Sequence, residues 1–582
     1  MFSRWLIGAI ACVGLSVHSC AASAQGALES TGLGDIDPWG VGRLSRAEGA
    51  LPVTLWQGSS VDSLMPLLGR LGVYQLSPTT RDLLQRVLLS PGRAPAGEDS
   101  DRLLAQRMRL IWDLGKLEAY AELARNMPDA EGIKSSTEAM VELQFVRGNE
   151  ASACSVVRSS IEVSPYLFQA RAVCFALEGN FASANLAIEL GLEQDAHDPW
   201  IQTAINALET MPEDDEARAE AELPEANFKS GLTTALSFAG EFPLPESVYS
   251  AVNPGFAREI SLRTDIERPM RIGMARRAAF NGLMIADELR EAYRRDPEPE
   301  PEVEDVSESE DEDVEDAAEA DAEAQSEEDE TDLDGEDWAD PLDRALYVLE
   351  DETTSEENKV ASIRRALIWA RSEPERFAIL AGVLRPYIAE INDFEAIGAN
   401  AEFFAIAMLA AGDQGQANRF QRMASVEGGP EEDAFLQAWL DGVRVVSGAD
   451  RSSASPRVVS RRLADTADEA TQSQTARMLH HFLVFDGALA PEAVEFLSGD
   501  AGDTLSSGTE LSVKDQILVR SNLNSGSVGE ALLRIVSALG RDPDRTQSAD
   551  LAEILELLST HGYEPEARRL ALEALNYQRV GD

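Results

Sequence analysis

The sequence predicts an all-α protein, and three observations lead to this fold class. Ala, Leu, Glu and Arg are abundant among the 582 residues and aromatic residues make up only 6%, a composition that favours helices over sheets. Apolar residues recur at three-and-four spacing, the period of one helix face, as at Leu64, Leu67 and Leu68. No segment shows a convincing strand-like alternation of apolar and polar residues. Hydrophobic residues make up 44%, enough to bury a sizeable core.

The first residues are typical of a secretory signal peptide. Arg4 precedes an apolar stretch at 6–17, which is too short to span a bilayer because a spanning helix needs about 20 residues. Small residues precede a cleavage site, so we expect cleavage between Ala24 and Gln25 and a periplasmic protein with no transmembrane segment. The alternative is a lipoprotein that is anchored at Cys20.

The rest of the chain divides by composition. Residues 25–60 are rich in Gly and Pro and contain Trp39 and Trp56, so we expect an irregular N-terminal arm that packs through these rings. Residues 61–295 and 339–582 carry the helical stripes, and we expect each to form a helical array. With the signal peptide and the acidic segment described next, the predicted division is 1–24, 25–60, 61–295, 296–338 and 339–582.

An acidic segment lies between the two arrays. Residues 296–337 contain 24 Asp or Glu and no Lys or Arg. Such a segment repels itself and cannot bury enough apolar surface to fold, so we expect a disordered linker at 296–338. Residues 330–335 resemble the first half of an EF-hand calcium loop, but Pro341 stands where the loop needs a bidentate Glu. We therefore expect only weak divalent cation association with this segment.

Segments of both arrays share a glycine turn that is followed by small residues. Gly148 precedes Ala153, and Gly179 precedes Ala184. Similar turns occur at Gly115, Gly412, Gly526 and Gly562. These segments resemble the tetratricopeptide repeat, in which a glycine turn joins two helices and small residues let them approach closely. The chain as a whole also resembles large secreted helical proteins of bacteria.

The resemblance to the tetratricopeptide repeat implies an α-solenoid of stacked helical hairpins in two arrays. Stacked hairpins form an extended concave surface, which suits the binding of a peptide or another protein. The same residues also fit an ordinary antiparallel helical array with Ala-rich interfaces.

The charge of the chain limits its partners. Asp and Glu number 103 against 50 Lys and Arg, which gives a net charge of −53 and argues against binding to nucleic acid or anionic lipid. Positive charge is concentrated at 258–295, which contains nine Arg. We interpret four of them, Arg268, Arg271, Arg276 and Arg277, as a candidate interaction surface for the acidic segment or an acidic partner. The alternative is that their stems cover a helix surface.

Two cysteines remain after cleavage, Cys154 and Cys174. Cys154 lies eleven residues before the turn at Pro165 and Cys174 nine after it, so both sit at similar heights on antiparallel helices. An exported protein is in an oxidising compartment, and we predict a disulfide between them. The alternative is two buried free thiols.

Sequence motifs for catalysis are few, and we predict no catalytic, cofactor or metal residue. The chain has no His-Glu-x-x-His pattern, no Gly-x-Ser-x-Gly turn and no phosphate-binding P-loop. Glu246–Ser247 resembles the Glu-Ser pair of lytic transglycosylases, but Ile285 follows Gly282-Leu283-Met284 where that family has Gln. A simple helix start near Pro245 explains the pair better.

These observations predict a non-catalytic periplasmic scaffold that binds another envelope protein or a peptide. The alternative function is a peptidoglycan-acting enzyme or enzyme subunit with a helical superdomain, similar to lytic transglycosylases.

Overall fold

A computed structural model describes most of the chain beyond residue 36. The described residues are 37–73, 76–127, 132–194, 196–212, 214–245, 247–295, 338–371, 374–427, 434–448, 455–499, 509–540 and 542–575. The predicted cleavage site at Ala24 and Gln25, the alternative anchor Cys20, Glu246 and the acidic residues 296–337 lie outside them.

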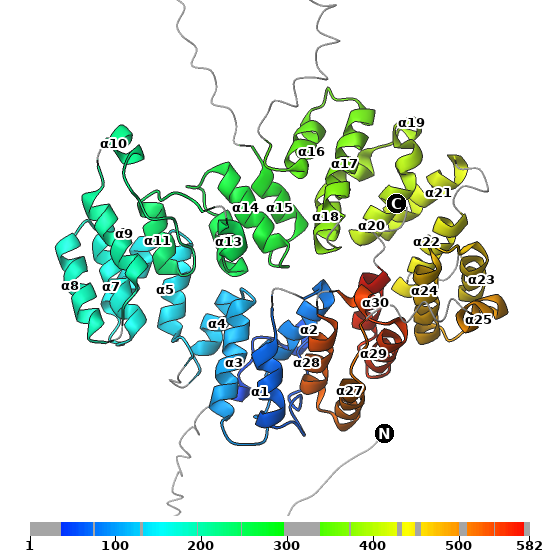
Figure 1. Cartoon of the computed structure of the whole chain (residues 1–582), viewed down its shortest axis with the longest axis horizontal. Helices are drawn as coiled ribbons and strands as arrows, with labels where there is room; N and C mark the ends of the chain where they lie inside the picture. The colour runs from blue at the N-terminus through cyan, green and yellow to red at the C-terminus, as the bar shows by residue number, and fades with distance from the viewer. Residues whose placement is uncertain are drawn as a thin grey trace, which may run out of the picture. The chain divides into compact units, whose positions relative to one another are not determined.

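The described residues fold into helices joined by short connections (Figure 1). The first helices are α1 (Val61–Arg70), α2 (Pro78–Leu89), α3 (Ser100–Asp113), α4 (Leu117–Ala124), α5 (Ser136–Val146), α6 (Glu150–Ser159), α7 (Pro165–Leu177) and α8 (Phe181–Leu192). They are followed by α9 (Pro199–Thr210), α10 (Asp215–Ala219), α11 (Gly231–Ala239), α12 (Val248–Ala251), α13 (Pro254–Ser261), α14 (Arg268–Ala279) and α15 (Ala286–Tyr293).

More helices follow the acidic segment. These are α16 (Pro341–Glu350), α17 (Glu356–Ala370), α18 (Pro374–Glu390), α19 (Phe394–Ile397), α20 (Ala401–Ala410), α21 (Gln414–Glu427), α22 (Ala434–Ser447), α23 (Pro456–Thr466), α24 (Gln472–Phe485), α25 (Pro491–Ser498), α27 (Val513–Ser525), α28 (Val528–Leu539), α29 (Ser548–Thr560) and α30 (Glu564–Leu575). Within the described residues, strand-like pairing is limited to two isolated bridges, Ser60 with Ala96 and Thr509 with Thr546. The all-α prediction is confirmed.

Glycine turns join pairs of helices at the positions that the sequence pattern indicates. Gly148 lies between α5 and α6 and Gly179 between α7 and α8, each with φ +74°. Gly115, Gly412, Gly526 and Gly562 also have positive φ and join α3 to α4, α20 to α21, α27 to α28 and α29 to α30. Glycine suits these turns because it has no Cβ to oppose the left-handed conformation. The small residues that follow, such as Ala153 and Ala184, are fully buried.

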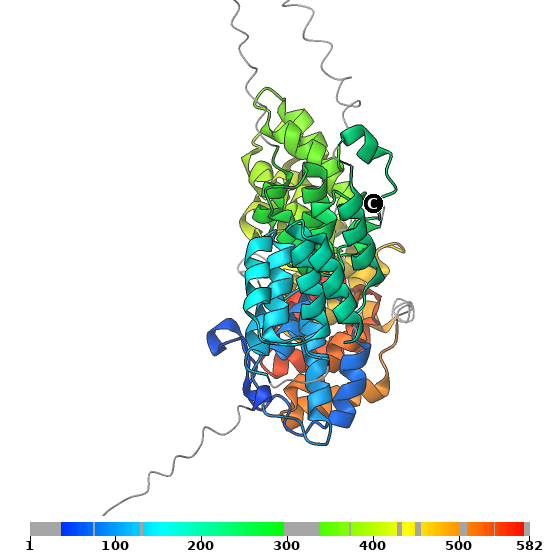
Figure 2. The same cartoon turned by 90° about the vertical axis from the view of Figure 1, so that its left-hand side faces the viewer.

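Two hydrophobic clusters hold the helices together. One contains residues from Leu117 to Met274, and helices α5 to α8 within it lie side by side in Figure 2. The other joins residues near the start of the described chain, such as Trp39, to residues near its end, such as Leu575. This second cluster includes residues of both predicted arrays. The division into two arrays stays a prediction.

The first and last helices pack against each other. Helix α2 contacts α28 and α30, where Arg86 Nη1 lies 2.6 Å from Glu566 Oε1. The backbone N–H of Gly529 donates to the carbonyl oxygen of Leu55 at 2.8 Å. A Cβ at Gly529 would lie 2.7 Å from the Trp56 ring, so this close approach requires glycine. The described residues near the start of the chain are therefore in contact with the described residues near its end.

Candidate functional site

A groove of about 420 Å³ is the candidate binding site. It lies between the start of α9, the connection at 223–230 and the short helix α12. Its walls include Trp200, Pro224, Phe228, Lys229, Ser247 and Val248. This volume is within the range of ligand sites, which are mostly apolar and carry a few polar groups.

Trp200 is held in place by the first turn of α9. Asp198 is the N-cap of the helix, and its Oδ1 accepts from the backbone N–H of Trp200 at 2.8 Å. Pro199 occupies the first helical position, where proline is well tolerated. The indole Nε1 donates to the carbonyl oxygen of Glu225 at 3.0 Å, and the ring meets Phe242 edge-to-face with 6.0 Å between centroids. The half-buried indole is therefore fixed at its polar end, with part of its surface exposed.

The connection at 223–230 is pinned along its length. The backbone N–H of Ala226 donates to the carbonyl oxygen of Pro243 at 2.9 Å, and that of Asn227 donates to Ser237 Oγ at 2.8 Å. Phe228 is buried against Phe238, with 5.5 Å between ring centroids. These contacts fix this irregular backbone at the wall of the groove.

A buried carboxylate fixes the helix that follows this connection. Glu142 on α5 accepts from the backbone N–H of Gly231, the first residue of α11. It also accepts from Tyr166 Oη at 3.1 Å and Lys134 Nζ at 3.1 Å. Burial, together with the nearby Glu142 charge, raises the pKa of Tyr166 well above its ordinary value. The neutral phenol and the lysine satisfy this carboxylate, which has a structural role.

Helix α12 is the opposite wall, and one of the predicted surface arginines supports it. Arg277 Nε donates to the carbonyl oxygen of Val252 at 3.2 Å, just after α12 ends. Gly273 on α14 lets the Tyr249 ring of α12 approach the backbone closely. Ser247 is the N-cap residue of α12, in agreement with the helix-start interpretation of the Glu246–Ser247 pair.

The other three predicted arginines bind groups within the chain. Arg268 pairs with Asp343 and donates to the carbonyl oxygen of Tyr293 at 2.7 Å. Arg271 Nε donates to the carbonyl oxygen of Ala292 at 3.2 Å. These contacts hold α14 to α15 and α16.

Arg276 completes this set. Its Nη1 lies 3.1 Å from Asp340 Oδ2, and its guanidinium lies 5.1 Å from the centroid of the Trp369 ring. Asp340 also accepts from Tyr293 Oη at 2.6 Å, and burial beside Asp340 raises the pKa of Tyr293 well above its ordinary value. The internal contacts agree with the alternative that these arginines cover a helix surface, and binding of an external acidic partner stays a prediction.

The cysteine pair is compatible with the predicted disulfide. Cys154 on α6 and Cys174 on α7 have Cα atoms 5.5 Å apart, which is the usual separation for a disulfide. Both side chains are buried, so the link would join the two helices from the inside.

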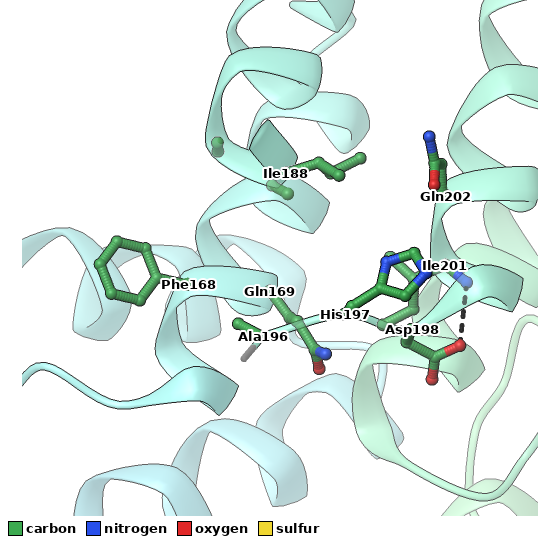
Figure 3. Close-up of a pocket in the computed structure, with 10 residues that line it drawn as sticks. Phe168, Gln169, Ile188, Ala196, His197, Asp198, Ile201 and Gln202 are labelled. Atoms are coloured by element: carbon green, nitrogen blue, oxygen red, sulfur yellow. Dashed lines mark hydrogen bonds between the residues drawn. The ribbon is translucent and has the colours of Figure 1, made fainter. Parts of the chain in front are cut away.

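A second, much smaller cavity lies between α7, α8 and α9 (Figure 3). Its free volume is about 10 Å³, which is close to the space of one water molecule. In Figure 3 the Asp198 carboxylate is turned toward the backbone N–H of Ile201 at 3.4 Å. The cavity is a packing gap beside small residues such as Ala172 and Ala187, and it is too small to hold a substrate.

Within the described ranges, no group of three or more His, Cys, Asp and Glu side chains could hold a metal ion. No helix in the described part of the chain combines the length and the hydropathy needed to cross a membrane. The EF-hand-like residues 330–335 lie outside the described residues.

The groove was not predicted from the sequence. Trp200, Phe228 and Val248 belong to three separate segments, and each by itself reads as an ordinary core residue. The prolines near 224 and 245 were a usable signal, because they indicate extended backbone between helices.

Comparisons with known proteins do not add a family. No protein-family model, curated protein or solved structure matches the chain. The resemblance to the tetratricopeptide repeat therefore stays a prediction.

Proposed function

We propose that the protein is a non-catalytic scaffold of the periplasm that binds another envelope protein, and that the Trp200 groove holds an extended segment of this partner. The observation that supports it is the groove itself, where a fixed indole and the irregular connection at 223–230 face the apolar side chains of α12. Aromatic side chains that are held rigid bind a partner at low entropic cost. Glu225 and Lys229 also line it and offer both signs of charge to a peptide backbone or side chain.

Export is part of the same proposal. The signal peptide at 1–24 is an expectation from the sequence, and the cysteine pair fits an oxidising compartment. The weak cation association of the acidic segment stays a proposal too.

Photo-crosslinking in the native envelope tests the function. A photo-reactive amino acid replaces Ser247 in the groove, and a matched chain carries it at exposed Val513 on α27. We expect position 247 to give a crosslink to one protein partner, which Trp200→Ala abolishes and which position 513 does not give. Equal crosslinks from both positions, or a crosslink that Trp200→Ala leaves unchanged, would contradict the proposal.

A specific observation keeps the enzyme alternative open. Pro245 and Ser247, the sequence neighbours of Glu246, both line the groove. Glu246→Gln tests it by assay on purified peptidoglycan. Release of soluble glycan by the wild type, with loss in this variant, would replace the scaffold by a glycan-acting enzyme.

A further inference from the structure

Helix α8 exposes an unusual amount of apolar surface. Leu186 and Leu190 have 56% and 50% of their surfaces exposed, and Leu192, on another side of the helix, has 51%. The two leucines are four residues apart and therefore lie on one face of the helix. A surface helix normally has a polar outer face, but Glu189 is the single charged residue of α8. Isolated exposed leucines are common, whereas an aligned pair on an otherwise apolar helix indicates a binding face.

The stretch of chain that contains this face carries charged residues of one sign. Residues 172–217 contain ten Asp or Glu and no Lys or Arg. Glu189 and Glu193 lie three and seven residues after Leu186, so they share its face, and both are exposed. A partner that covers the leucines therefore meets carboxylates directly beside them. Basic groups complement these carboxylates, and an acidic or anionic partner is repelled.

The helix has a firm base under this face. Helix α8 packs along α7 through its buried small residues Ala184, Ala187 and Gly191. Helix α7 in turn packs against α6, where Cys154 and Cys174 lie with their Cα atoms 5.5 Å apart. The exposed leucines therefore lie on helices that are held at fixed positions. Binding then costs less conformational entropy, because the helices need not be ordered by the partner.

We propose that the face of α8 made by Leu186, Glu189, Leu190 and Glu193 binds a basic amphipathic helix of another protein. The apolar stripe of such a helix covers the leucines, and its Lys or Arg side chains pair with the two glutamates. A second copy of this chain is a poor occupant, because two acidic faces repel each other. The inference takes from the proposed function only that the protein binds proteins, and it names a surface separate from the Trp200 groove.

A binding titration tests this surface. The probe is a short fluorescent peptide of Leu and Lys at helical spacing, titrated with the full chain at low and at high salt. Two double variants are compared with the wild type: Leu186→Ser with Leu190→Ser, and Glu189→Lys with Glu193→Lys. We expect each double variant to bind the peptide about tenfold more weakly or worse than the wild type. High salt should reduce the peptide affinity of the wild type more than that of either variant. All the replaced side chains are exposed, so the melting temperature should not change.

Helix α27 supplies a matched control. Val513 and Ile517 are also four residues apart and are 69% and 61% exposed, but Lys514 and Arg520 lie near them. Val513→Ser with Ile517→Ser should leave the affinity for the peptide unchanged. The proposal is overturned if the peptide does not bind the wild type, if the α27 variant weakens binding as much as the α8 variant, or if the same leucines mediate dimer formation instead. Trp200→Ala should not change the affinity for this peptide. A negative result for the α8 face therefore leaves the proposal for the Trp200 groove untouched.

Discussion

The junction of α14, α15 and α16 and the hairpin of α7 and α8 use charge in opposite ways. At the junction, Asp340 and Asp343 are buried and each lies against an arginine of α14. On α8 and at its C-cap, Glu189 and Glu193 are exposed within a stretch of chain that has no Lys or Arg. In the first region the charged side chains pair with one another inside the fold. The second leaves negative charge beside exposed leucines, where it is available to a partner.

The difference shows why a cluster of arginines is a poor guide to a binding surface in an acidic protein. Burying a carboxylate is costly unless a cation compensates it, and at this junction Arg268 and Arg276 lie against the buried acids Asp343 and Asp340. The unused acids then mark the faces that remain open.

Removing a buried acid at the junction should have the largest effect. Asp343 is 1% exposed, and Asp343→Ala leaves the mostly buried Arg268 without its counter-ion. We expect the free energy of unfolding to fall by about 3 kcal/mol, measured by urea denaturation with circular dichroism.

Asp287→Ala is the control for this prediction. Its side chain is 62% exposed and pairs with Arg290, so the loss should be below about 0.5 kcal/mol. Similar losses in the two variants would show that the junction does not depend on buried charge.

Removing the cysteine pair should have a similar or slightly smaller effect. The two cysteines are 20 residues apart, and replacing both by Ser should cost about 3 kcal/mol if they are bonded. Reductant should lower the stability of the wild type to that of the double variant, and leave the variant unchanged. If a thiol assay of the denatured, unreduced protein finds two free thiols, the pair is not bonded.

His481 extends the comparison to a buried group with no counter-ion. Both ring nitrogens lack a hydrogen-bond partner within the described residues, and burial lowers the pKa of His481 well below its ordinary value of 6.5, helped by Arg477 and His480. Below pH 6.5 the unfolded chain binds a proton that the folded chain does not, so stability falls as the pH drops.

Urea denaturation at several pH values measures this effect. We expect a loss of about 2 kcal/mol between pH 7 and pH 5 from this residue. His481→Phe should remove that part of the pH dependence. An unchanged slope in this variant would show that His481 is not buried in its neutral form.

The smallest effect is expected at an exposed pair near α8. Arg158 and Glu178 form an ion pair, but their side chains are 54% and 48% exposed. Glu178→Gln should change the free energy of unfolding by less than about 0.5 kcal/mol in thermal or urea denaturation. A loss as large as that of Asp343→Ala would remove the contrast between the two regions.

Local patterns in the sequence determined much of the fold. Apolar stripes such as the one after Ser60 require only helical periodicity, and glycine turns such as Gly148 and Gly179 require only a local backbone conformation. The proximity of the two cysteines could be predicted for the same reason. A single turn joins their antiparallel helices, so the number of residues from the turn places Cys154 and Cys174 level with each other along the helix axes. These features depend on residues close together in the chain.

The tertiary structure decided which distant residues meet. Nothing local indicates that Arg268 pairs with Asp343 across the acidic segment, or that Leu55 lies against Gly529. Nor does local pattern bring Trp200 and Val248 to one groove. Such contacts depend on the angle and offset of each helix on its neighbours, which arise from the fit of side chains along whole interfaces. The positions of the helices and their turns therefore follow from local sequence, whereas tertiary packing sets which charges are paired inside the fold and which surfaces remain exposed to a partner.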